Sequence, residues 1–227
     1  MRTATLAAVL ACGLLLVACG SEEAAAPLTL EQRVVGTAEA PGSEPDPDET
    51  PVTATELDEL ESALGGPPIY DEDIRALGQA GFVSLVADTR FFPSEPGGEH
   101  IPRTSPHVFT VVYQSESAAG ASEAVGIAHR IGLRPCPETC AYEITEFQPT
   151  GVPNAKGVQA IATQESIDRI GDDIQPDARY SVYFSDGAFA YEVTTFGPPE
   201  AVSRQQVEDI AAKLYARIKG APLPESS

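Results

Sequence analysis

The chain of 227 residues contains no tryptophan, four cysteines and a single methionine, which is Met1. Without tryptophan, an aromatic platform for a sugar would have to be built from tyrosine or phenylalanine. A chain without methionine after its first residue does not carry the soft thioether ligands that suit copper. These absences disfavour a glycosidase and a copper-trafficking protein.

Basic residues are also scarce. Lysine and arginine together number 14 against 34 aspartates and glutamates, so the formal net charge is −20 at pH 7. A field of this sign repels phosphate backbones and anionic lipid surfaces. We therefore expect no nucleic-acid partner, whereas basic partners and metal ions remain electrostatically permitted.

Recognisable catalytic motifs are missing as well. The sequence has no Gly-x-Ser-x-Gly, no Ser-x-x-Lys, no phosphate-binding glycine loop and no dinucleotide fingerprint. His100, His107 and His129 form no metal-ligand pattern, and no acidic cluster has the spacing of a calcium loop. We expect a protein without catalytic residues, cofactor or metal, although carboxylates could still hide an enzyme.

The amino terminus has the pattern of an export signal. Arg2 precedes an apolar run over residues 6–18, which is shorter than the ~20 residues of a membrane-spanning helix. Residues 1–18 are therefore predicted to be a signal peptide. Leu16-Val17-Ala18-Cys19 resembles the lipobox of bacterial lipoproteins, which implies cleavage before Cys19 and acylation of its thiol. An ordinary secretory leader is the alternative, and the rival match ending at Cys12 leaves too short an apolar stretch.

The next segment is predicted to be a disordered acidic tether, over residues 19–51. Between residues 20 and 51 there is no aromatic residue, and eight acidic residues face one basic residue. Such a composition cannot bury enough apolar surface to offset the entropy of ordering. The exception that remains open is a short stretch that could pack, formed by Leu28, Leu30, Val34 and Val35. We expect one globular domain over residues 52–222 and a flexible tail over 223–227.

The domain is predicted to be α+β, with a mostly antiparallel sheet and helices on one face. Asp186-Gly187 between two aromatic-rich runs predicts a hairpin, and Ser203 with Gln206 has the capping-box spacing that starts a helix. The order of elements suggests two ββα-type halves. The expected elements are helices over 55–64, 71–80, 117–131 and 203–218, and strands over 82–92, 108–113, 180–184 and 188–196.

Cys136 and Cys140 are the two cysteines that remain after the leader and Cys19. Outside the cytoplasm, such an even pair predicts a small-loop disulfide. A redox pair is the alternative, but the spacing is not Cys-x-x-Cys.

Tyr180, Tyr183 and Tyr191 on the predicted hairpin are a candidate contact surface, since tyrosine combines apolar area with a polar tip. The alternative is that these side chains belong to the sheet core.

The whole pattern is similar to that of actinobacterial surface lipoproteins with sensor-like domains. That resemblance implies a non-catalytic module on the extracytoplasmic face of the cell membrane, bound to it through Cys19, that binds an envelope protein or a small ligand. Two alternatives remain: an envelope hydrolase or thiol-redox enzyme, and a structural surface lipoprotein.

The lipid anchor is directly testable. Intact-mass measurement of protein extracted from its native host should show a chain that begins at Cys19 and carries acyl chains. An unmodified thiol at Cys19, or a retained leader, would contradict the predicted location.

Overall fold

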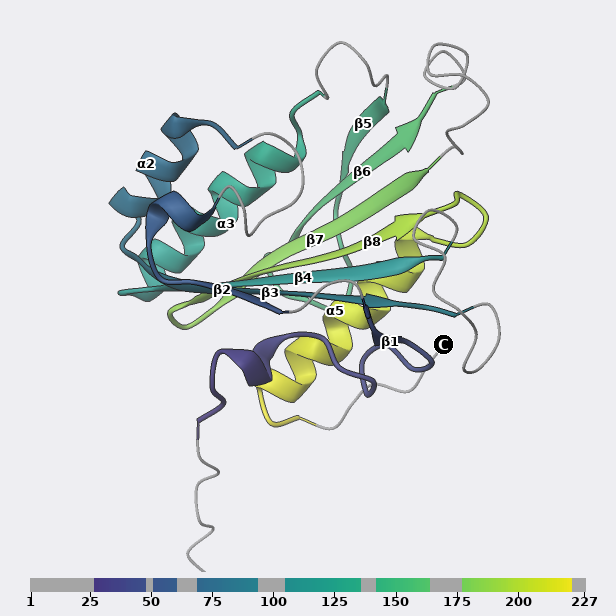
Figure 1. The fold of residues 1–227 in the computed structure, drawn as a ribbon, viewed down its shortest axis with the longest axis horizontal. Helices are drawn as coiled ribbons and strands as arrows, with labels where there is room; N and C mark the ends of the chain where they lie inside the picture. The colour runs from purple at the N-terminus through teal and green to yellow at the C-terminus, as the bar shows by residue number, and fades with distance from the viewer. Residues whose placement is uncertain are drawn as a thin grey trace, which may run out of the picture.

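The computed structural model describes residues 27–47, 51–60, 69–93, 105–135, 142–163 and 177–221. Their strands form one eight-stranded sheet with the order β1-β3-β4-β8-β7-β6-β5, in which β2 also pairs with β3 and every pairing is antiparallel (Figure 1). The strands are β1 (Glu44–Pro45), β2 (Val52–Ala54), β3 (Phe82–Phe91), β4 (His107–Ser115), β5 (Tyr142–Phe147), β6 (Lys156–Ala162), β7 (Ala178–Asp186) and β8 (Phe189–Gly197). The helices are α2 (Asp71–Gln79), α3 (Ala118–Gly132) and α5 (Arg204–Ile218), with 3-10 turns η1 (Glu31–Arg33) and η2 (Leu57–Glu59). The predicted α+β class and antiparallel sheet are confirmed.

Local signals place the elements of the second half. β7 and β8 pair from Ala178 to Asp186, and their two-residue turn is Gly187-Ala188, one position later than Asp186-Gly187. Gly187 has φ +56°, a conformation that glycine adopts without steric cost. The side chain of Ser203 accepts a hydrogen bond from the Gln206 N–H at 3.2 Å and so begins α5 as predicted.

The helices lie on both faces of the sheet, not on one as predicted. Tyr183 of β7 belongs to the apolar cluster that packs against α2 and α3. Its neighbours Val182 and Phe184 point to the opposite face and pack against α5. Because all three side chains are almost completely buried, both faces need a cover.

The two predicted ββα-type halves have the same order of elements, but their helices lie on different faces of the sheet. β3, β4 and α3 are followed later by β7, β8 and α5, and β4 pairs antiparallel with β8 at the centre of the sheet. A rotation that brings β3 and β4 onto β7 and β8 would leave both helices on the same face. Since α3 and α5 lie on opposite faces, the ββα units do not superimpose as copies.

The predicted tether is wrong for residues 27–47, which pack against the domain (Figure 1). Val35 and Ala40 are about 1% exposed and join the α5-side cluster. The segment then runs to the edge of the sheet, where β1 pairs with β3. The domain therefore begins well before residue 52.

Two glycines of α3 differ in how much space surrounds them, because one of them lies close to the sheet. A Cβ on Gly132 would lie 2.3 Å from the Tyr183 hydroxyl oxygen, whereas a Cβ on Gly126 would meet no atom within 4 Å. Gly126→Ala should therefore raise the free energy of unfolding by about 1 kcal/mol through helix propensity. Gly132→Ala should lower it by about 1–3 kcal/mol through overpacking.

Urea unfolding followed by circular dichroism measures both changes. Tyr183→Phe removes the clashing hydroxyl, so it should recover part of the loss in the Gly132→Ala background. Equal effects of the two glycine substitutions would contradict this packing.

Candidate functional site

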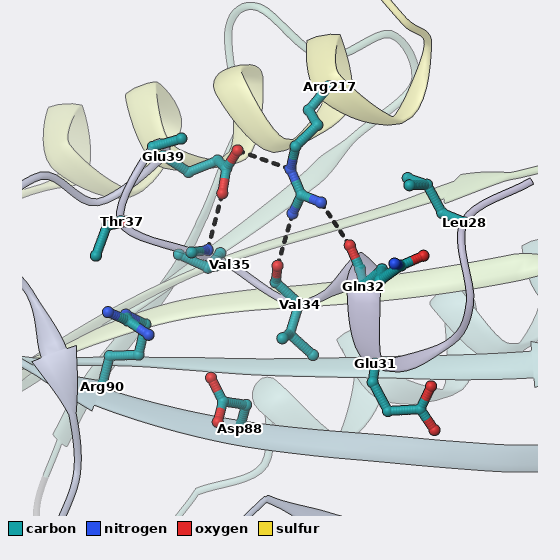
Figure 2. A pocket seen from close by; sticks show the side chains of 12 residues that line it. Leu28, Glu31, Gln32, Val34, Val35, Thr37, Glu39, Asp88, Arg90 and Arg217 are labelled. Carbon is teal, nitrogen blue, oxygen red and sulfur yellow. Dashed lines mark hydrogen bonds and ion pairs between the residues drawn. The ribbon is translucent and has the colours of Figure 1, made fainter. Parts of the chain in front are cut away.

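Residues 27–47, here called the N-terminal segment, are held against the rest of the domain by Arg217 of α5 (Figure 2). Its Nε donates to Glu39 Oε1 at 2.7 Å and its Nη2 donates to the Val34 carbonyl at 2.6 Å. Its Nη1 donates to the Gln32 carbonyl. Glu39 is 1% exposed and also accepts from the Gly36 N–H at 2.8 Å. The ion pair is buried on the Glu39 side and partly exposed on the Arg217 side, and both side chains make further hydrogen bonds, as burial of charge requires.

Arg33 supplies a second attachment. Its Nη1 donates to the Tyr191 hydroxyl at 2.7 Å, and its guanidinium lies 3.7 Å from the centroid of the Phe189 ring. The contact of a guanidinium with a ring face is favourable where water is excluded. The single basic residue of the supposed tether is therefore an anchor to the β7–β8 hairpin.

Arg90 of β3 makes the third attachment. Its Nε donates to Ser43 Oγ at 2.9 Å and its Nη2 donates to the Ser43 carbonyl at 3.0 Å. Arg90 is 9% exposed, so these two bonds hold a buried guanidinium in one orientation.

A hollow of about 510 Å³ lies between the attached segment and the sheet. Its lining comes from the segment between Leu28 and Glu39, from Asp88 and Arg90 on β3, and from Arg217 on α5 (Figure 2). Asp88 and Arg90 are two residues apart on one strand and therefore project from the same face of the sheet. Figure 2 shows both side chains turned towards the segment. The hollow thus combines an irregular lining with charges placed by a regular strand.

Asp88 has an unusual environment within this hollow. The side chain is half-buried, and it forms no hydrogen bond or ion pair with any residue in the described ranges. Burial raises the pKa of the Asp88 carboxyl, and the positive charge of Arg90 only partly opposes this. A carboxylate that has lost part of its water without a hydrogen bond from the described residues is a candidate for binding a cationic group.

A second polar cluster lies on the α3 face of the sheet. Thr194 Oγ1 donates to Glu192 Oε1 at 3.1 Å and lies 2.7 Å from Ser181 Oγ. Burial raises the pKa of Glu192, while Arg179 and the Thr194 and Tyr183 hydroxyls oppose the increase. Because these groups form hydrogen bonds with one another, we assign them a role in stabilising the sheet and not in binding a ligand.

The histidines of the described ranges are also paired with carboxylates. His107 Nε2 lies 3.5 Å from Asp46 Oδ2, and both side chains are buried. His129 Nε2 lies 3.2 Å from Glu146 Oε1. Within the described part of the chain, no group of three or more His, Cys, Asp or Glu side chains is placed to hold a metal ion.

The tyrosines predicted as a contact surface do not form one. Tyr183 and Tyr191 are each 1% exposed, on opposite faces of the sheet, and only Tyr180 is partly exposed. Their rings fill the core because β7 and β8 are covered on both sides. Cys19, Cys136 and Cys140 lie outside the described residues, so the lipid anchor and the disulfide stay predictions.

Sequence reasoning missed Asp88, Arg90 and Arg217. A weak signal was present for the first two, because Asp88 and Arg90 occupy alternate positions of a strand whose other face is mostly apolar. Arg217 resembles any basic residue in the last turn of a helix. Its partners are about 180 residues away in sequence, so no local pattern announces them.

Comparison with known proteins shows the fold but no family. No protein-family model matches the chain, and no curated protein matches it. A similar solved structure is the extracellular domain of PknH from Mycobacterium tuberculosis, with a TM-score of 0.51 and 14% sequence identity. The alignment covers 86% of this chain and 98% of that one. This chain therefore shares the fold of an extracellular domain from an actinobacterium.

The raised pKa of Asp88 predicts a pH-dependent stability difference. Above its ordinary pKa of 3.8, the charged carboxylate opposes folding, because the folded state holds the proton more tightly than the unfolded chain. Asp88→Asn should therefore raise the melting temperature at pH 7. This gain should shrink as the pH falls through the raised pKa of the folded state, and it should disappear below 3.8, where the carboxyl is protonated in both states.

Thermal unfolding between pH 3 and pH 7 tests the difference. Asp58→Asn is the matched control, because Asp58 is exposed and should show no such dependence. A lower melting temperature for Asp88→Asn at pH 7 would be inconsistent with an unpartnered carboxylate.

Proposed function

We propose that this protein is a non-catalytic binding module on the extracytoplasmic face of the cell membrane, anchored through an acylated Cys19. Its binding site is the hollow between the N-terminal segment and β3. The observation that carries the proposal is a hollow of about 510 Å³ that presents the Asp88 carboxylate of β3, which has no hydrogen bond or ion pair within the described ranges. The hollow is largely open to solvent, and its volume lies within the roughly 300–1,000 Å³ range of small-molecule sites.

The location is supported by two independent features. Residues 1–18 have the pattern of a signal peptide, and the residues before Cys19 resemble the lipobox of exported, acylated proteins. The shared fold is that of an extracellular domain. In the ranges that the structure describes, no helix is long and apolar enough to cross a membrane.

The attachment of the segment is consistent with a binding role for this hollow. Arg217, Glu39 and Arg90 already engage the segment through hydrogen bonds and are held in fixed orientations. These contacts hold the lining of the hollow in place, so little of it has to be ordered when a ligand binds.

The proposal is tested by ligand-observed NMR with a library of small polar fragments. Thr37 is exposed and lines the hollow, so Thr37→Trp should fill the space without disturbing the core. Fragments that bind the wild-type domain should lose binding at least tenfold in this variant. Thr145→Trp on the exposed surface of β5 is the matched control and should bind them normally.

The absence of any bound fragment, or equal binding to wild type and Thr37→Trp, would contradict the proposed site. Loss of binding in both tryptophan variants would also count against it, because the effect would then not be specific to the hollow.

A further inference from the structure

We infer that the hollow recognises a small zwitterion, namely a free α-amino acid with an aliphatic side chain. This inference rests on the proposed function and specifies the chemical class of its ligand. Asp88 would bind the ammonium group, and Arg90 would bind the carboxylate.

Asp88 is the cation-binding group of the pair. Its carboxylate faces the hollow without a hydrogen bond or ion pair to any described residue. An ammonium group carries three N–H donors, so it can replace the water that burial has removed from this carboxylate. A ligand without a positive charge would leave the carboxylate as it is in the free protein.

Arg90 is the anion-binding group. Ser43 engages the guanidinium through Nε and Nη2, which leaves Nη1 without a hydrogen bond to any residue in the described ranges. Arg90 lines the same hollow as Asp88. A guanidinium held in this way presents its remaining donors to a carboxylate in a fixed direction.

The spacing of the two groups suits a compact zwitterion. Asp88 and Arg90 leave the same face of β3 two residues apart, which is about 7 Å along a strand. An ammonium and a carboxylate on one carbon atom can bridge such a pair through two charge-assisted hydrogen bonds of about 2.8 Å each. A dicarboxylate or a diamine would place one of its charges next to a like charge.

The other charges of the hollow do not compete for this ligand. Arg217 and Glu39 neutralise each other in a partly buried ion pair. Glu31 is exposed. Leu28 and Val34 are partly exposed apolar side chains in the lining, and they offer a surface for an aliphatic side chain.

Isothermal titration calorimetry at pH 6.5 with three related probes tests the inference. L-Leucine carries both charges, leucinamide carries only the ammonium, and N-acetyl-leucine carries only the carboxylate. Leucine should bind at least tenfold more tightly than either single-charge analogue. Binding of leucinamide or N-acetyl-leucine as tight as that of leucine would overturn the inference, as would the absence of leucine binding.

Substitution of Asp88 provides the second test. Asp88→Asn should weaken leucine binding at least tenfold while the domain stays folded, and Asp58→Asn should leave leucine binding unchanged. Unchanged leucine affinity in Asp88→Asn would overturn the inference. If fragments bind in the hollow but leucine does not, the amino-acid ligand is refuted and the proposed function stands. Fragment binding that Thr37→Trp does not affect would refute the proposed function itself.

Discussion

The structure depends on a sheet that is apolar on both faces. On β7, consecutive residues Val182, Tyr183 and Phe184 are all almost completely buried although they point alternately to opposite sides. A sheet of this kind is stable only when each face is covered. α3 covers one face of the sheet and α5 covers the other (Figure 1).

α5 alone does not complete its face, and the N-terminal segment adds to the cover. The segment contributes few apolar side chains, of which Val35 and Ala40 are buried, so its position depends on the arginine contacts of Arg33, Arg90 and Arg217. An irregular segment held at separate points packs less closely than a helix. The hollow lies at this boundary, and seven residues separate the segment from Cys19. Under the proposed function, one stretch of chain thus forms the binding site and leads to the membrane.

Particular elements show where sequence reasoning succeeded and where it failed. The β7–β8 hairpin and the start of α5 were predictable because Gly187 and Ser203 act through hydrogen bonds and dihedral angles within a few residues. The tether prediction was wrong because it averaged composition over the segment. A few buried side chains and ion pairs with distant partners were enough to order residues 27–47.

The sequence by itself determined the secondary structure of the hairpin and the main helices, the α+β class and the acidic surface, because these follow from local dihedral preferences, periodicity and charge. Only the tertiary structure decided that α3 and α5 lie on opposite faces, that Tyr183 and Tyr191 are core residues, and that Asp88 and Arg90 face the segment held by Arg217. The physical reason is that burial and pairing depend on contacts between residues far apart in the chain, and such contacts leave no periodic signal in the sequence.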